Sequence, residues 1–180
     1  MSKIVSMLRG VNVGGHHKIK MTELKKVYES LGYEKVQTYI QSGNVVFETK
    51  ERGDEKLARK IGAAIEKKFG FCPEVIVRTA EEMRDVVKRN PFAKRNDVEP
   101  NKLAVFFLAS DPGKAARAAV ADIEADPEEL RPLGSEIYIY FPDGQGKSKL
   151  KFSKVEKAIG KIAWTARNWN TVLKLVELCK

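Results

Sequence analysis

A glycine-rich segment with a guanidinium and an amide side chain follows the first apolar run of the chain. Arg9 and Asn12 lie in segment 9–15, between a predicted strand and a predicted helix. Such loops often hold phosphate with backbone N–H groups, and a fork-shaped guanidinium suits a phosphate or a carboxylate. The glycine spacing does not match the dinucleotide-binding fingerprint, and glycines that only permit positive φ in a surface turn explain the segment equally well.

A second group of polar side chains, Gln41, Ser42 and Asn44, lies on a predicted hairpin between two alternating runs. Turn chemistry alone accounts for the residue types. In a split β-α-β sheet, however, the first strand pairs antiparallel with the third, so its end lies at the same edge as this hairpin. We therefore expect segments 9–15 and 41–44 to be neighbours and to form a candidate ligand-binding site.

A third group of candidate ligand-binding residues lies near the C-terminus. Lys149 follows a glycine loop, and Arg167, Asn168 and Asn170 are predicted to open the last helix, whose N-terminal N–H groups attract anions. We expect Lys149 and Arg167 to face a common anion, with Asn168 or Asn170 adding polar contacts. The alternative is a solvated Lys149 and an Arg167 that pairs with a local acid such as Glu156.

Motifs for metal binding and nucleophilic catalysis are missing. Segment 144–148 resembles a Walker A loop, but Phe141 stands where that motif needs a glycine. The two cysteines are far apart and the two histidines are adjacent, so their spacing predicts no metal site and no triad. No cofactor is predicted.

The charge distribution favours an anionic partner. The formal net charge is +9. Residues 145–180 contain nine Lys or Arg and two acids, which gives +7 in that segment. A concentrated basic segment is a better sign of phosphate contact than a basic average, although a solvated lysine-rich surface explains it as well.

The apolar pattern places these groups on two similar halves. In the first half it predicts strands at 4–9, 36–40, 45–49 and 75–77, with helices that begin near Thr22 and Asp54. This β-α-β-β-α-β order is ferredoxin-like. Thr79 and Glu82 form a capping box for a third helix, which stops before Pro91.

The second half repeats the order of elements. Segment 90–101, with two prolines, is the predicted linker between domains 1–90 and 91–180. Strands are predicted at 103–108, 130–132 and 136–141, and helices at 112–124, 153–162 and 168–179. The predicted class is α+β, with two ferredoxin-like subdomains of antiparallel sheets backed by helices. No signal peptide and no apolar run of membrane-spanning length is present, so we expect a cytoplasmic protein without a membrane partner.

Several strings of the sequence resemble a family of uncharacterised bacterial proteins. They are segments 8–15 (LRGVNVGG), 20–24 (KMTEL), 38–47 (TYIQSGNVVF), 148–150 (SKL) and 165–171 (TARNWNT). They are similar to the DUF1697 family over nearly the whole chain, with Ala166 where a second threonine is usual. The resemblance implies duplicated ferredoxin-like subdomains and supplies no activity.

Three functions remain open from the sequence. The leading hypothesis is a binding module for a phosphorylated or anionic ligand, such as a nucleotide or RNA. The second is an enzyme that acts on a small phosphorylated substrate with Arg9, Lys149 and Arg167 as charge clamps. The third is a structural or assembly protein without a ligand. RNA stacking on the second sheet would need Tyr138 and Tyr140 to be exposed.

Overall fold

A computed structural model describes all residues from 1 to 180. The chain forms two compact units, one of Met1–Asp85 with Lys174–Lys180 and the other of Val86–Leu173. Each unit contains one four-stranded antiparallel sheet. The predicted α+β class with two ferredoxin-like repeats is confirmed. The domain boundary between residues 90 and 91 stays a prediction.

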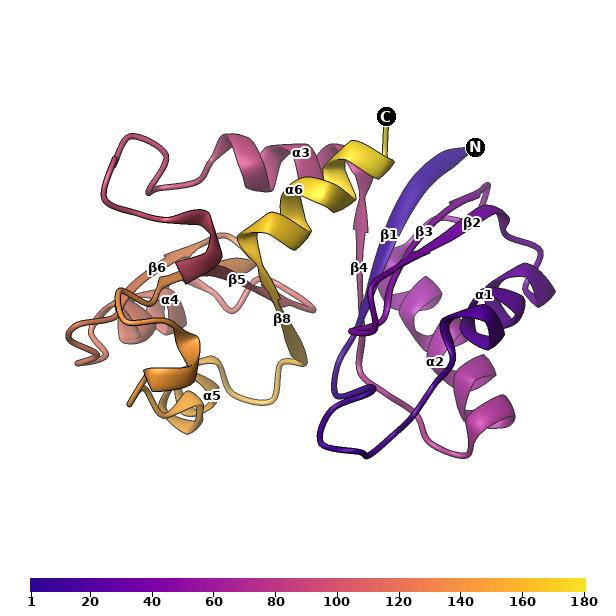
Figure 1. The fold of residues 1–180 in the computed structure, drawn as a ribbon, viewed down its shortest axis with the longest axis horizontal. Coiled ribbons are helices and arrows are strands. Elements are labelled where there is room, and N and C mark those ends of the chain that lie inside the picture. The colour runs from indigo at the N-terminus through magenta and orange to yellow at the C-terminus, as the bar shows by residue number, and fades with distance from the viewer. The chain divides into compact units, whose positions relative to one another are not determined.

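The first unit contains the first β-α-β-β-α-β repeat. Its elements are β1 (Ser2–Leu8), α1 (Met21–Ser30), β2 (Glu34–Tyr39), β3 (Asn44–Thr49), α2 (Asp54–Phe69) and β4 (Val75–Thr79), followed by α3 (Ala80–Lys88). The strand order is β2-β3-β1-β4, and α1 and α2 lie on one face of the sheet (Figure 1). The observed N-caps of the two helices lie slightly before the predicted ones. Lys20 is the N-cap of α1, whereas Thr22 was predicted, and Gly53 is the N-cap of α2, whereas Asp54 was predicted.

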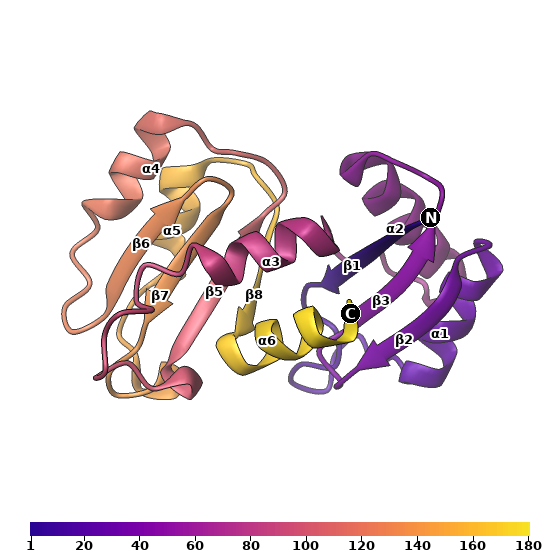
Figure 2. The same ribbon diagram turned by 90° about the horizontal axis from the view of Figure 1, so that it is seen from above.

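The second unit contains the second repeat. Its elements are η1 (Pro100–Lys102), β5 (Leu103–Leu108), α4 (Lys114–Ala121), β6 (Glu129–Leu133), β7 (Glu136–Tyr140), η2 (Gln145–Lys147), α5 (Phe152–Ile159) and β8 (Trp164–Asn168), followed by α6 (Trp169–Leu178). The strand order β6-β7-β5-β8 matches that of the first sheet (Figure 2). The prediction missed β8 and assigned part of it to the last helix.

Local sequence chemistry accounts for the start of α3. The backbone N–H of Glu82 donates to the Thr79 hydroxyl oxygen at 3.1 Å, and the backbone N–H of Thr79 donates to the Glu82 carboxylate at 2.7 Å. These reciprocal bonds satisfy donors that a helix start leaves open. The predicted capping box is confirmed.

Each sheet packs an apolar core against its two helices. In the first unit Ile4 and Leu8 of β1 contact residues of α1 and α2, and the hydroxyls of Ser6 and Tyr28 share a buried hydrogen bond of 2.6 Å. In the second unit the Phe106 and Trp164 rings stack with centroids 4.8 Å apart. Alternation along the strands sends the other side chains to the opposite face, where Val5 and Val105 are also fully buried.

None of the helices has the length and apolar character needed to cross a bilayer.

Candidate functional site

The glycine-rich loop after β1 is tied to the β2–β3 hairpin by Asn12. Its side-chain amide donates to the Gln41 carbonyl at 2.8 Å and to the Ile19 carbonyl at 3.0 Å, and its side-chain oxygen accepts from the Ile19 N–H at 2.8 Å. The residue has φ 55°, a left-handed conformation that asparagine tolerates better than most side chains. The segments therefore lie together as their topology predicts, and Asn12 holds the backbone of both.

Gly43 allows the hairpin to approach the end of β1. The Leu8 N–H donates to the Gly43 carbonyl at 2.9 Å. A Cβ at position 43 would lie 2.8 Å from Cγ2 of Val11 and 2.9 Å from Cβ of Leu8, and the residue has φ +83°. Glycine is required here on both steric and conformational grounds.

The remaining candidate residues of this loop pair also have structural partners. The Asn44 amide, which is fully buried, donates to the Tyr39 carbonyl at 3.0 Å and to the Ser42 hydroxyl oxygen at 2.9 Å. Arg9 forms a partly exposed ion pair with Glu74 at 2.9 Å. Apart from the exposed Gln41, which takes part through its backbone carbonyl, the polar side chains of the predicted site bind protein groups. The motif is therefore explained by its role in fixing two loops.

Arg167 was predicted to lie at a helix start. It lies instead in β8, one residue before the end of the strand and opposite Val105 of β5. Its guanidinium is buried and donates to the Thr165 hydroxyl oxygen at 2.9 Å and to the Ala166 carbonyl at 2.8 Å. Burial lowers the pKa of this guanidinium to about 10, so it stays a cation at neutral pH. The error arose because a five-residue strand directly before a helix carries too little periodicity to be separated from it.

Lys149 and Arg167 lie in different surroundings, because Lys149 is exposed whereas Arg167 is buried. Ala166 packs on the helix-covered side of the sheet, so alternation directs Arg167 to the opposite face. Leu150, the neighbour of Lys149, packs on the helix-covered side. The Glu156 carboxylate accepts from Nε1 of Trp164 at 3.1 Å. The alternative pairing of Arg167 with Glu156 stays a prediction.

The two asparagines of this region lie at the start of α6. The Asn168 side-chain oxygen accepts from the Asn170 N–H at 2.9 Å, and its amide donates to the Asn101 carbonyl at 3.1 Å. Asn168 therefore caps the helix and ties it to the segment before β5. Asn170 is exposed, and its backbone serves that cap.

A cationic surface lies on the second unit around α5. Its members, here called the lysine face, are Lys147, Lys149, Lys151, Lys154, Lys157 and Lys161. All six are exposed, and none forms an ion pair. The acids of segment 143–163 are Asp143 and Glu156, so the segment carries 6 − 2 = +4.

The fold of α5 explains why these lysines are presented together. Val155 and Ile159 are buried in the core of the second unit. Lys154 and Lys157 are three residues apart, so they share the outer side of the helix, about 60° from each other. Lys151 precedes the helix and Lys161 follows it. The sequence predicted a basic segment at 145–180 and named only Lys149 of this face as a site residue. The three-residue spacing of Lys154 and Lys157, opposite an apolar stripe, is the signal that could have identified the rest of the face.

Aromatic rings are not available beside the lysine face. Phe152 packs edge-on against Phe106, with ring centroids 5.2 Å apart. Tyr138 and Tyr140 of β7 are buried, and their hydroxyls donate to the Val86 and Asp97 carbonyls. None of these rings presents a face to a nucleic-acid base, so the contact this surface can offer is to phosphate.

Side chains of His, Cys, Asp and Glu form no group of three that could hold a metal ion.

Comparison with known proteins places the chain in a family. None of the curated proteins matches its sequence. The structure is similar to that of a conserved bacterial protein from Streptococcus pneumoniae, with 24% sequence identity, 99% of both chains covered and a TM-score of 0.73, which supports the shared fold. The family model described as a protein of unknown function, DUF1697, matches residues 1–138. The chain therefore belongs to the DUF1697 family.

Proposed function

We propose that this protein binds the phosphate backbone of a nucleic acid such as RNA through the lysine face. The observation that carries the proposal is a run of exposed lysines, over segment 147–161, without carboxylate partners. Cations without acidic partners repel one another, and a polyanion relieves that repulsion while it releases its own counterions.

The shape of the surface favours an extended partner over a small phosphorylated molecule. Lys151, directly before α5, and Lys157, in its last turn, are six residues apart, which is roughly 9 Å at the helical rise. Successive phosphates of one strand advance by about 3.4 Å along a duplex axis, so several could contact this surface together. A single small phosphate could contact only a part of it.

The expected binding is independent of base sequence. Affinity from lysine–phosphate contacts falls as salt rises, and without exposed aromatic rings no stacking adds base preference. Oligonucleotides of equal length and different sequence should therefore bind with similar affinity.

The test compares two charge-matched triple variants by fluorescence anisotropy with a labelled single-stranded RNA of about 20 nucleotides. K151Q/K154Q/K157Q removes three members of the lysine face, and K50Q/K56Q/K94Q removes three exposed lysines from elsewhere. Both variants lower the formal charge from +9 to +6. The first should weaken binding at least about tenfold near 50 mM salt and reduce the salt slope by up to about 2.

The control variant should bind nearly as tightly as the unmodified protein. Equal losses in both variants would assign the binding to net charge and remove the role of the lysine face. Absence of RNA binding by the unmodified protein at low salt would overturn the proposal.

A further inference from the structure

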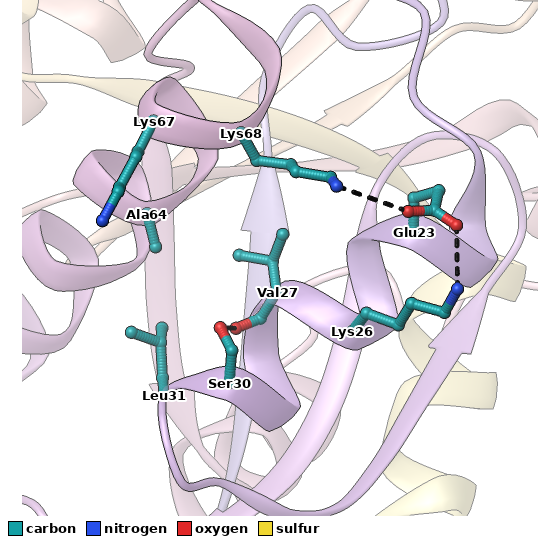
Figure 3. Close-up of a pocket in the computed structure, with 8 residues that line it drawn as sticks. All are labelled: Glu23, Lys26, Val27, Ser30, Leu31, Ala64, Lys67 and Lys68. Atoms are coloured by element: carbon teal, nitrogen blue, oxygen red, sulfur yellow. Dashed lines mark hydrogen bonds and ion pairs between the residues drawn. The ribbon is translucent and has the colours of Figure 1, made fainter.

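A groove of about 670 Å³ lies on the outer surface of the first unit, between α1 and α2. Figure 3 shows its lining residues from both helices. Its apolar side chains, Val27, Leu31 and Ala64, lie between the lysines that the two helices contribute. A concave surface of this volume falls within the usual range for small-molecule sites.

The charged residues of the groove are unbalanced. Glu23 contacts Lys26 at 3.1 Å and Lys68 at 3.8 Å, and Lys67 forms no ion pair. The adjacent ammonium of Lys26 lowers the pKa of Glu23, which is therefore ionised at neutral pH. One carboxylate among three lysines leaves a charge of +2.

The local folding of both helices accounts for this arrangement. Leu24 and Tyr28 of α1 and Ile61 and Ile65 of α2 point into the core. Val27 belongs to that core, Leu31 and Ala64 pack against it, and all three also line the groove. The apolar part of the groove is thus held by packed residues, while the lysine stems extend over it from the surface.

We propose that this groove binds a small amphiphilic anion, a molecule with an apolar body and one carboxylate. The apolar body would lie along Val27, Leu31 and Ala64, and the carboxylate would pair with Lys67, the lysine of the groove that forms no ion pair with Glu23 (Figure 3). The site is in the first unit and is independent of the lysine face and of the function proposed for it. A medium-chain acyl carboxylate has both of these parts and serves as the probe.

Octanoate tests the proposal against two molecules that each lack one part, the neutral 1-octanol and the chainless acetate. Two-dimensional amide NMR of the full chain reports the affinity and also the place of binding. Octanoate should shift the amide signals of Val27, Leu31 and Ala64. It should bind at least about fivefold more tightly than octanol or acetate. Octanol lacks the ion pair with the lysine, and acetate lacks the apolar contact with the groove.

Two pairs of variants separate the contributions of charge and apolar surface. K67Q/K68Q should weaken octanoate binding by about fivefold or more and leave octanol unchanged, whereas K56Q/R59Q, on the same helix outside the groove, should leave both unchanged. A64L fills the groove and should weaken both ligands. A63L, one position away and exposed, should weaken neither.

The lysine variants decide the outcome even if A64L fails to fold. Octanoate shifts confined to other parts of the chain, or an unchanged octanoate affinity in K67Q/K68Q, would overturn the proposal. Equal affinity for octanoate and octanol would show that the lysines attract no anion and would overturn it as well. Loss of RNA binding in the lysine-face variant would have no bearing on these shifts, so the two proposals fail separately.

Discussion

Side-chain amides act as substitutes for backbone pairing at several turns of this protein. Asn12 ties the loop after β1 to the hairpin, Asn44 closes the hairpin, and Asn168 caps α6. Each of these positions leaves backbone groups that neither a strand nor a helix satisfies. Asparagine side chains at loop positions would also suit a ligand-binding site. Residue type and position are therefore compatible with ligand binding and with a structural role, and only the observed hydrogen-bond partners distinguish the two.

Two tyrosines of the first core differ in the partner of the hydroxyl. The Tyr28 hydroxyl is hydrogen bonded to Ser6, whereas the Tyr33 hydroxyl is buried without a hydrogen-bond partner. Both rings contact Phe47, with centroids 5.4 Å and 4.5 Å away. Burial raises the pKa of Tyr33 to about 12, so its hydroxyl is neutral at pH 7.

Removing each hydroxyl should therefore change stability in opposite directions. Y28F leaves the Ser6 hydroxyl without its partner and should lower the free energy of unfolding by about 1–3 kcal/mol. Y33F removes a buried polar atom that has no partner and should raise that free energy by up to about 1 kcal/mol. Urea denaturation followed by circular dichroism measures both, and changes of the same sign would contradict the assignment.

At the scale of the element, β8 is a strand that the sequence pattern could not identify. The strand runs from Trp164 to Asn168, is covered on both faces and continues directly into α6. Burial on both faces removes the alternation that identifies a strand, and the short length leaves helix and strand indistinguishable by period. By contrast, β2 and β3 were predicted closely, because the intervening turn and the alternating runs mark both strands.

The capping box of α3 should contribute measurably to stability. T79A removes the hydroxyl that accepts from the Glu82 N–H, and it should lower the free energy of unfolding by about 1 kcal/mol. T79S keeps the oxygen and should restore most of that loss. E81A, in the same first turn but outside the box, is the matched control and should cost clearly less. A loss in T79S as large as that in T79A would contradict the role of the hydroxyl.

At the scale of the whole molecule, both repeats arrange their strands in the same way. The central strands β1 and β5 each pair with the third and the fourth strand of their repeat. Arg78 and Arg167 occupy equivalent positions, opposite Val5 and Val105, and both are buried. Element order was enough to predict this architecture. The lysine face and the groove could not be predicted in this way, because identifying them requires knowing which charged side chains form ion pairs, and only the three-dimensional contacts show that.

The last residues of the chain belong to the unit that contains the first residues. Leu175 and Cys179 are buried, and Leu178 lines a small cavity of about 120 Å³ together with Lys3 and Val46. Deleting residues 174–180 should therefore expose the sheet of the first unit and lower amide-exchange protection in β1 and β3. Strands β5 and β7 should keep their protection. Deletion of the exposed Lys180 alone is the control, and unchanged protection in β1 and β3 after the full deletion would refute the assignment.

This path of the chain affects the order in which the protein can be completed on the ribosome. The sheet and the two covering helices of the first unit are encoded before residue 85, but segment 174–180, which completes that unit, is translated only after the second unit. At about 5–20 residues per second, the 95 residues from position 86 to position 180 take roughly 5–19 s to synthesise. During that interval the apolar side chains of Val5, Met7 and Val46 belong to a unit that still lacks its last helical turns. A nascent chain stalled in this window should bind a hydrophobic-surface chaperone more strongly than the finished protein does.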